Sequence, residues 1–283
     1  MLNFIQYSIY VNLAVGLIFS TTVFVNAQEE IDSDNERYLN CVSLALDTPR
    51  LAEEIGTSWK NSGGGFPARH CISLANANMG FYEKAAYEFE AISNEIVVQE
   101  FKGVTTPLSG DIKGLRIELL AQAGNSWLLA NKPKLANQAF SKALLEFFGA
   151  PIVKVELLID RSRSFALLND FDSAIKDLDE AQLEAPQRAD IFVLRSSAKR
   201  LLKKYDEAFI DVELALFREP ENRDGLLERG NLRSLKGNIE GAIEDWEYLI
   251  YLYPNTTSAE LATKNLENLR VEEDFKISQK KNK

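Results

Sequence analysis

The sequence predicts an all-α protein built from repeated antiparallel helix pairs, and two observations support this prediction. Four residue types recur at one constant interval along the C-terminal half of the chain. The recurring positions are Ala174, Ala208 and Ala242; Pro186, Pro220 and Pro254; Arg161, Arg195 and Arg229; and Asp177, Asp211 and Asp245. Each interval also holds two stretches of helical apolar periodicity around a polar break, which is typical of a helical hairpin. The proline then ends the second helix, because the residue before a proline is disfavoured in the α region.

The N-terminal segment, residues 1–27, is predicted to be a signal peptide, followed by an acidic linker at residues 28–35. No charged side chain occurs before Glu29, and the apolar stretch ends in Val25-Asn26-Ala27, a pattern at which signal peptidase cleaves. An uncleaved membrane anchor is the alternative, since residues 9–25 reach the lower limit for spanning a bilayer. In both cases the remainder is exported, so we expect an oxidising compartment.

Three regular helix pairs are predicted at residues 155–188, 189–222 and 223–256. Their residues resemble the tetratricopeptide repeat, a helix–turn–helix unit of about 34 residues with fixed small, bulky and proline positions. The best match carries Ser196, Tyr205, Ala208, Val212, Ala215 and Pro220 at those positions. The resemblance implies a right-handed superhelical solenoid of antiparallel helix pairs over residues 36–270.

The other parts of this array are less regular. Upstream pairs are predicted at residues 117–151 and about 66–98, with a degenerate pair at 36–62 that breaks at Asp47-Thr48-Pro49. An insertion of unknown role falls at residues 93–111. Residues 257–270 are expected to form a capping helix, and residues 271–283 a flexible tail. Small residues such as Gly230 and bulky ones such as Trp246 are predicted to fill the core between helices.

The composition argues against several classes of function. A formal net charge of −10 is unfavourable for a protein that binds nucleic acid, because phosphate binding needs a basic face. Two cysteines and one histidine offer few ligands for a metal, and we expect no cofactor. No G-x-S-x-G or H-E-x-x-H motif occurs. His70 lies beside Cys71, so a Cys–His nucleophile pair is the catalytic alternative to a structural histidine.

Cys41 and Cys71 are predicted to form a disulfide. They are the two cysteines of a chain expected to be exported, and they fall on the first helices of adjacent helix pairs. The bridge would secure the part of the array in which the repeat pattern is poorest. Two separate buried thiols are the alternative.

The arginine and aspartate ladders predict ion pairs within each repeat. In an antiparallel hairpin, an arginine at repeat position 7 lies opposite an aspartate at position 23. This predicts the pairs Arg161–Asp177, Arg195–Asp211 and Arg229–Asp245. We expect these pairs to be structural, whereas a row of arginines that binds anions is the functional alternative.

The resemblance also implies a concave groove formed mainly by the first helix of each pair. At the corresponding positions, Asn125, Arg163, Arg200 and Asn231 are expected to face the groove and to hydrogen-bond a peptide or protein partner. The alternative is a solvated concave face without a dedicated ligand. We therefore expect a non-catalytic interaction scaffold in the bacterial periplasm. The alternatives are an enzyme or enzyme subunit with a site near His70 and the 93–111 insertion, and a membrane-tethered assembly organiser facing the periplasm.

Overall fold

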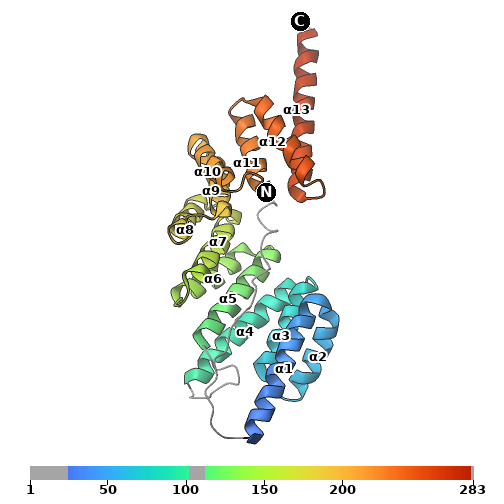
Figure 1. Ribbon diagram of the computed structural model, residues 1–283, viewed down its shortest axis with the longest axis vertical. Helices are drawn as coiled ribbons and strands as arrows, with labels where there is room; N and C mark the ends of the chain where they lie inside the picture. The colour runs from blue at the N-terminus through green and yellow to red at the C-terminus, as the bar shows by residue number, and fades with distance from the viewer. Residues whose placement is uncertain (1–24, 102–111, 282–283) are drawn as a thin grey trace. The chain divides into compact units, whose positions relative to one another are not determined.

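The computed structural model describes residues 25–101 and 112–281. In these residues the chain forms thirteen helices and no strand (Figure 1), which confirms the predicted all-α class. The helices are α1 (Val25–Asp47), α2 (Pro49–Asn61), α3 (Gly65–Asn78), α4 (Tyr82–Phe101), α5 (Ile112–Leu129), α6 (Pro133–Leu145), α7 (Pro151–Leu167), α8 (Phe171–Glu184), α9 (Ala189–Leu201), α10 (Tyr205–Arg218), α11 (Arg223–Leu235), α12 (Ile239–Leu252) and α13 (Thr257–Lys281).

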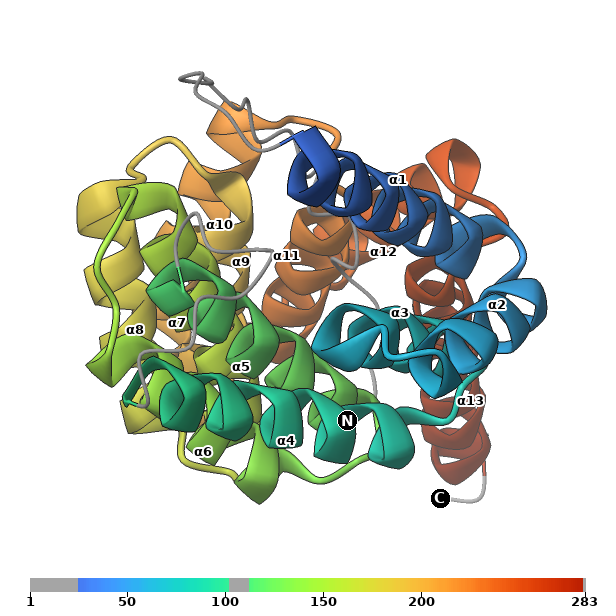
Figure 2. The ribbon, with the colours of Figure 1, turned by 90° about the horizontal axis from the view of Figure 1, so that it is seen from below.

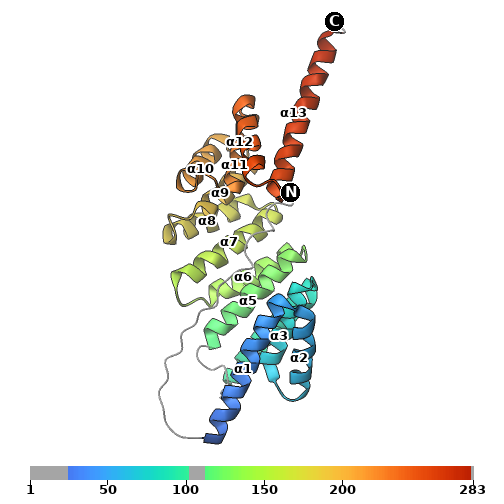
Figure 3. The ribbon, with the colours of Figure 1, turned by 45° about the vertical axis from the view of Figure 1, so that its right-hand side comes forward.

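The helices pack in two compact units. The N-terminal unit holds α1 to α6 and α7 as far as Ser164, and the C-terminal unit holds the chain from Phe165 onward. In the N-terminal unit α1 packs against both α2 and α3 (Figure 2). In the C-terminal unit α9 to α13 follow one another as stacked pairs (Figure 3). α9 contacts α11, and α11 contacts α13, so the first helices of successive repeats lie next to each other.

The turns inside the helix pairs fall at the predicted polar breaks. Asn169, Lys203 and Gly237 each follow a first helix and have positive φ values of 61°, 62° and 84°. A left-handed residue at this point stops the first helix and reverses the chain. Asp170 and Asn238 then cap the second helices, since each side chain accepts a hydrogen bond from the backbone N–H three residues later.

Two helices are longer than expected. Residues 28–35, expected as a linker, lie within α1, and residues 271–281, expected as a flexible tail, continue α13. Neither helix contains a glycine or a proline, so no residue breaks the helical pattern there. Residues 93–101 of the expected insertion extend α4. The remainder of that insertion, with Gly103 to Pro107, and residues 1–24 of the expected signal peptide lie outside the described residues.

The core between α11 and α12 depends on one glycine. Gly230 faces the buried indole of Trp246, and a Cβ at Gly230 would collide with the indole Nε1. Trp246 packs in turn with apolar residues of α10 to α13, among them Ala208, Ala242, Leu226 and Leu249. The predicted pairing of a small residue with a bulky one is therefore confirmed here.

The Gly230→Ala variant is expected to lose about 1–3 kcal/mol of unfolding free energy, because the indole is enclosed and must shift to admit the methyl group. Denaturant unfolding of the variant and the wild type measures this loss. Gly237→Ala is the matched control: its Cβ meets no atom within 4 Å, so its effect reports the strain of positive φ alone. A Gly230→Ala protein as stable as the wild type would contradict the packing argument.

Two of the three predicted arginine–aspartate pairs are confirmed. Arg195 donates from Nε and Nη2 to the two oxygens of Asp211, at 2.9 and 2.7 Å. Arg229 makes the equivalent bonds to Asp245, with Nη2 at 2.7 Å from Oδ1. The third pair, Arg161–Asp177, would join residues of different units and stays a prediction.

The same arginines also connect successive repeats, which the sequence did not suggest. Arg195 of α9 bonds Asp179 of the preceding second helix, with Nη1 2.6 Å from Oδ1. Arg229 likewise bonds Glu213, at 3.3 Å. Each guanidinium therefore joins the second helix before it to the second helix after it, so α8, α10 and α12 are linked in a row.

A double-mutant cycle with Arg195→Ala and Asp211→Ala is expected to give a coupling of about 1–3 kcal/mol. The carboxylate of Asp211 is only 3% exposed, so loss of the guanidinium leaves a charge out of water. Lys199, whose Nζ lies 2.8 Å from the same carboxylate, partly compensates and limits the effect. Additive single effects in thermal unfolding would mean that the pair contributes nothing to stability.

Candidate partner-binding face

In the C-terminal unit, polar side chains of consecutive first helices bond to one another in a row. Arg200 of α9 donates from Nε to Oε1 of Glu228 on α11, at 2.7 Å. Asn231 lies one turn after Glu228 on α11, and its side chain helps to stabilise the Glu228 carboxylate. The Oδ1 of Asn231 accepts from Nδ2 of Asn265 on α13, at 2.8 Å. We call Arg200, Glu228, Asn231 and Asn265 the first-helix row.

Two of the predicted groove residues, Arg200 and Asn231, thus lie in this row, whereas sequence reasoning missed Asn265. A signal for it existed, because Asn265 lies one repeat interval after Asn231. A second pair follows the same interval: Ser258 donates from Oγ to Oδ1 of Asp224, one repeat earlier, at 2.7 Å. The repeat interval therefore continues for one repeat beyond the last regular helix pair, and these two hydrogen bonds fix α13 against α11.

Glu228 is the buried centre of the row. Burial raises the pKa of its carboxyl group, and the guanidinium of Arg200 opposes that rise. The Arg200 side chain is 23% exposed. Within the described part of the chain its Nη1 and Nη2 have no bonded partner, so Glu228 fixes the Nε side of the guanidinium and leaves two donor nitrogens at the surface.

In the N-terminal unit the predicted groove residues converge on one carboxylate. Asn125 of α5 donates from Nδ2 to Oδ2 of Asp160 on α7, at 3.1 Å. Arg163, one turn after Asp160 on the same helix, donates to its Oδ1. Burial raises the pKa of Asp160 despite these two bonds. Arg163 is only 7% exposed, so it mainly neutralises Asp160 and offers a partner less surface than expected.

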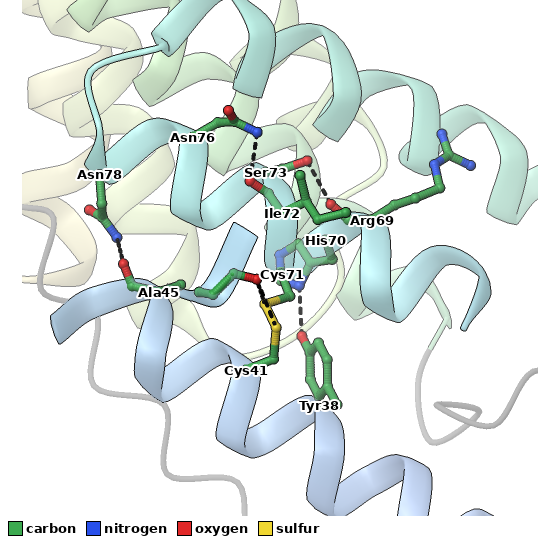
Figure 4. Close-up of a disulfide and its surroundings, with 11 residues drawn as sticks. Tyr38, Cys41, Ala45, Arg69, His70, Cys71, Ile72, Ser73, Asn76 and Asn78 are labelled. Atoms are coloured by element: carbon green, nitrogen blue, oxygen red, sulfur yellow. Dashed lines mark hydrogen bonds between the residues drawn. A yellow bond between two sulfur atoms is a disulfide. The ribbon is translucent and has the colours of Figure 1, made fainter. Parts of the chain in front are cut away.

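His70 lies at the centre of a buried polar cluster beside the disulfide (Figure 4). The hydroxyl of Tyr38 on α1 lies 2.7 Å from Nδ1, and Oε1 of Gln122 on α5 lies 2.7 Å from Nε2. These contacts fit a neutral imidazole that accepts from Tyr38 and donates to Gln122. Gln122 in turn donates from Nε2 to Oε1 of Glu118, at 3.2 Å.

The predicted disulfide is confirmed. Cys41 of α1 is bonded to Cys71 of α3, with a Cα–Cα distance of 5.9 Å (Figure 4). Because Cys71 is bonded, it has no thiolate, and the alternative of a Cys–His nucleophile pair with His70 does not form. Both ring nitrogens of His70 are occupied by side chains of the same unit.

No group of three or more His, Cys, Asp or Glu side chains suited to a metal ion occurs in residues 34–96 and 113–271. Among the described helices, none combines the length and the apolar character needed to cross a bilayer.

Comparisons with known proteins give matches to solved structures alone: no protein-family model and no curated protein sequence matches the chain. Residues 41 to the end of MamA from Desulfovibrio magneticus RS-1 share 15% identity, covering 67% of this chain and 95% of that one, with a TM-score of 0.51. A double mutant of RS-1 MamA gives 16% identity over the same shares, also at 0.51. The second TPR domain of human RPAP3, solved with an HSP70 peptide, shares 21% identity over 42% of this chain and 98% of its own, at 0.38.

Proposed function

We propose that the chain is a non-catalytic scaffold that binds a protein or peptide. Its regular helix pairs and its likeness to MamA, a TPR-repeat protein, show that it has the tetratricopeptide-repeat fold. The first-helix row carries this proposal. Arg200 is fixed on the buried carboxylate of Glu228 and keeps two donor nitrogens at the surface. Donors held in this way suit backbone carbonyls or carboxylates of an extended segment, because little side-chain entropy is lost on binding.

The test is affinity capture with the full chain. Arg200→Gln removes the charge and the fixed donors, and the variant is expected to lose a partner that the wild type retains. Lys203→Gln is the matched control, since it removes one exposed positive charge from the turn after α9. Circular dichroism and melting temperature verify that both variants are folded. An identical set of partners for all three proteins would overturn the assignment to the first-helix row.

The proposed location is the periplasm, after cleavage of a signal peptide behind Ala27. Two observations support export: the uncharged apolar segment before Glu29 and the Cys41–Cys71 disulfide, since structural disulfides persist in oxidising compartments. N-terminal sequencing of the protein from cells is expected to begin at Gln28. A chain that begins at Met1 would favour the membrane-tethered alternative.

A further inference from the structure

The second helices of the C-terminal unit expose large apolar side chains at one repeated position. Leu183 of α8, Phe217 of α10 and Tyr251 of α12 follow one another at the repeat interval and are 83%, 84% and 80% exposed. Two more exposed apolar residues, Leu214 and Tyr248, lie one turn earlier on α10 and α12. Exposure of a single large apolar residue is ordinary, but its repetition at one position of three consecutive repeats is not.

These side chains lie on one face of the unit. Arg195 bonds carboxylates of α8 and α10, and Arg229 bonds carboxylates of α10 and α12, so the three helices are linked in order. Since equivalent repeat positions point in equivalent directions, the three apolar residues form a stripe across neighbouring helices. We call Leu183, Leu214, Phe217, Tyr248 and Tyr251 the second-helix stripe.

Acidic side chains border the stripe. Glu184 directly follows Leu183, and Glu247 and Glu244 precede Tyr251 by one and two helical turns, so these exposed carboxylates lie beside the stripe. At the position equivalent to Glu247 on the other two helices, Asp179 and Glu213 are already bonded to Arg195 and Arg229. Arg218 is turned back onto the ring of Phe192, 4.4 Å from its centroid. The carboxylates that the described residues leave without a basic partner beside the stripe are those of Glu184, Glu244 and Glu247, and they make its border on α8 and α12 negative.

We propose that the second-helix stripe docks a basic amphipathic helix of a partner protein, on a surface separate from the first-helix row. The apolar side of such a helix would cover Leu183, Phe217 and Tyr251, while its lysines and arginines would meet the bordering carboxylates. A second copy of the chain fits poorly, since two acidic borders would face each other. An anionic membrane surface is disfavoured for the same reason.

The probe is a synthetic amphipathic peptide of leucine and lysine, four helical turns long, titrated against the full chain by fluorescence anisotropy. The double variant Phe217→Ser/Tyr251→Ser is expected to bind it at least about tenfold more weakly, because exposed aromatic side chains are typical anchors of interfaces. Folding of this variant is not at risk, since both side chains are largely exposed. Leu235→Ser, which removes an exposed apolar residue from α11, is the matched control and is expected to bind like the wild type.

Charge is tested in the same assay. Glu244→Gln/Glu247→Gln is expected to weaken binding and to reduce its salt dependence, whereas a peptide with glutamate in place of lysine should not bind. Equal binding by the wild type and the Phe217→Ser/Tyr251→Ser variant, or no binding of the basic peptide, overturns the proposal. Two further results would overturn the proposal: dimerisation in sedimentation, or binding to phosphatidylethanolamine–phosphatidylglycerol vesicles, if the Phe217→Ser/Tyr251→Ser variant abolishes either one. The occupant of the stripe would then be a second copy of the chain or a membrane.

Discussion

Removal of the Cys41–Cys71 disulfide is expected to destabilise the N-terminal unit by about 3–4 kcal/mol. The bridge joins α1 to α3 across a sequence separation of 30 residues. Closing a loop of this length lowers the conformational entropy of the unfolded chain, and this loss of entropy accounts for the expected 3–4 kcal/mol, to within about 1 kcal/mol. The buried residues around it are small, namely Ala45, Ala52 and Ala75. Apolar burial contributes less there than between repeats with large side chains, and the covalent link therefore matters more.

Amide hydrogen exchange measures this effect locally. In the Cys41→Ala/Cys71→Ala variant, exchange of the most protected amides of α1 to α3 is expected to rise by about two to three orders of magnitude, while α9 to α12 exchange as before. Reductant should reproduce the change in the wild type and have no effect on the variant, which is the control. Unchanged protection of α1 in both experiments would show that packing alone holds it.

The second large effect is a loss of stability as the pH falls from about 6.5 to 4. Burial lowers the pKa of His70 to about 4, below its ordinary value of 6.5, because the imidazolium form would be out of water. The unfolded chain therefore takes up a proton in this window and the folded chain does not. The free energy of unfolding therefore keeps its full value above pH 6.5 and falls by about 2–3 kcal/mol as the pH approaches 4.

His70→Leu isolates this contribution, because leucine does not titrate. The variant also leaves Tyr38 and Gln122 without their His70 partner, which lowers its stability by an amount that does not change between pH 7 and pH 4.5. The difference in unfolding free energy between wild type and variant is expected to shrink from pH 7 to pH 4.5. Glu118, whose pKa is raised by burial, is present in both proteins and largely cancels in the comparison. Parallel pH curves for the two proteins would contradict a buried neutral histidine.

Much of the fold could be predicted because the repeat interval fixes local and tertiary structure together. Ala208 and Ala242 occupy one repeat position, and Val212 and Trp246 occupy another, and all four lie in the core. Residues at the same repeat position therefore make equivalent packing contacts. The ends of the array are different. Near residues 36 and 270, where the array was expected to end, α1 and α13 contain no glycine or proline, so nothing in the sequence showed that these helices extend beyond the repeat pattern.

The candidate site could be predicted only in part. The position of Arg200 and Asn231 on first helices follows from the repeat register, but their bonding partners depend on side-chain conformations. Arg163 shows the difficulty: it bonds Asp160, three residues earlier on its own helix, and is buried there. The stripe of Leu183, Phe217 and Tyr251 was missed because the three residues are not identical, although their spacing is as regular as that of the prolines.

Site-specific photo-crosslinking tests the central claim, that the first helices bind the partner, most directly. A photoreactive residue at Ser234, which occupies on α11 the repeat position that Arg200 occupies on α9, should crosslink to the captured partner, and Arg200→Gln should abolish the product. The same residue at the exposed Gln187, in the loop before α9, should give no product. A partner that crosslinks equally at both positions, or that persists in the Arg200→Gln variant, would contradict binding along the first-helix row.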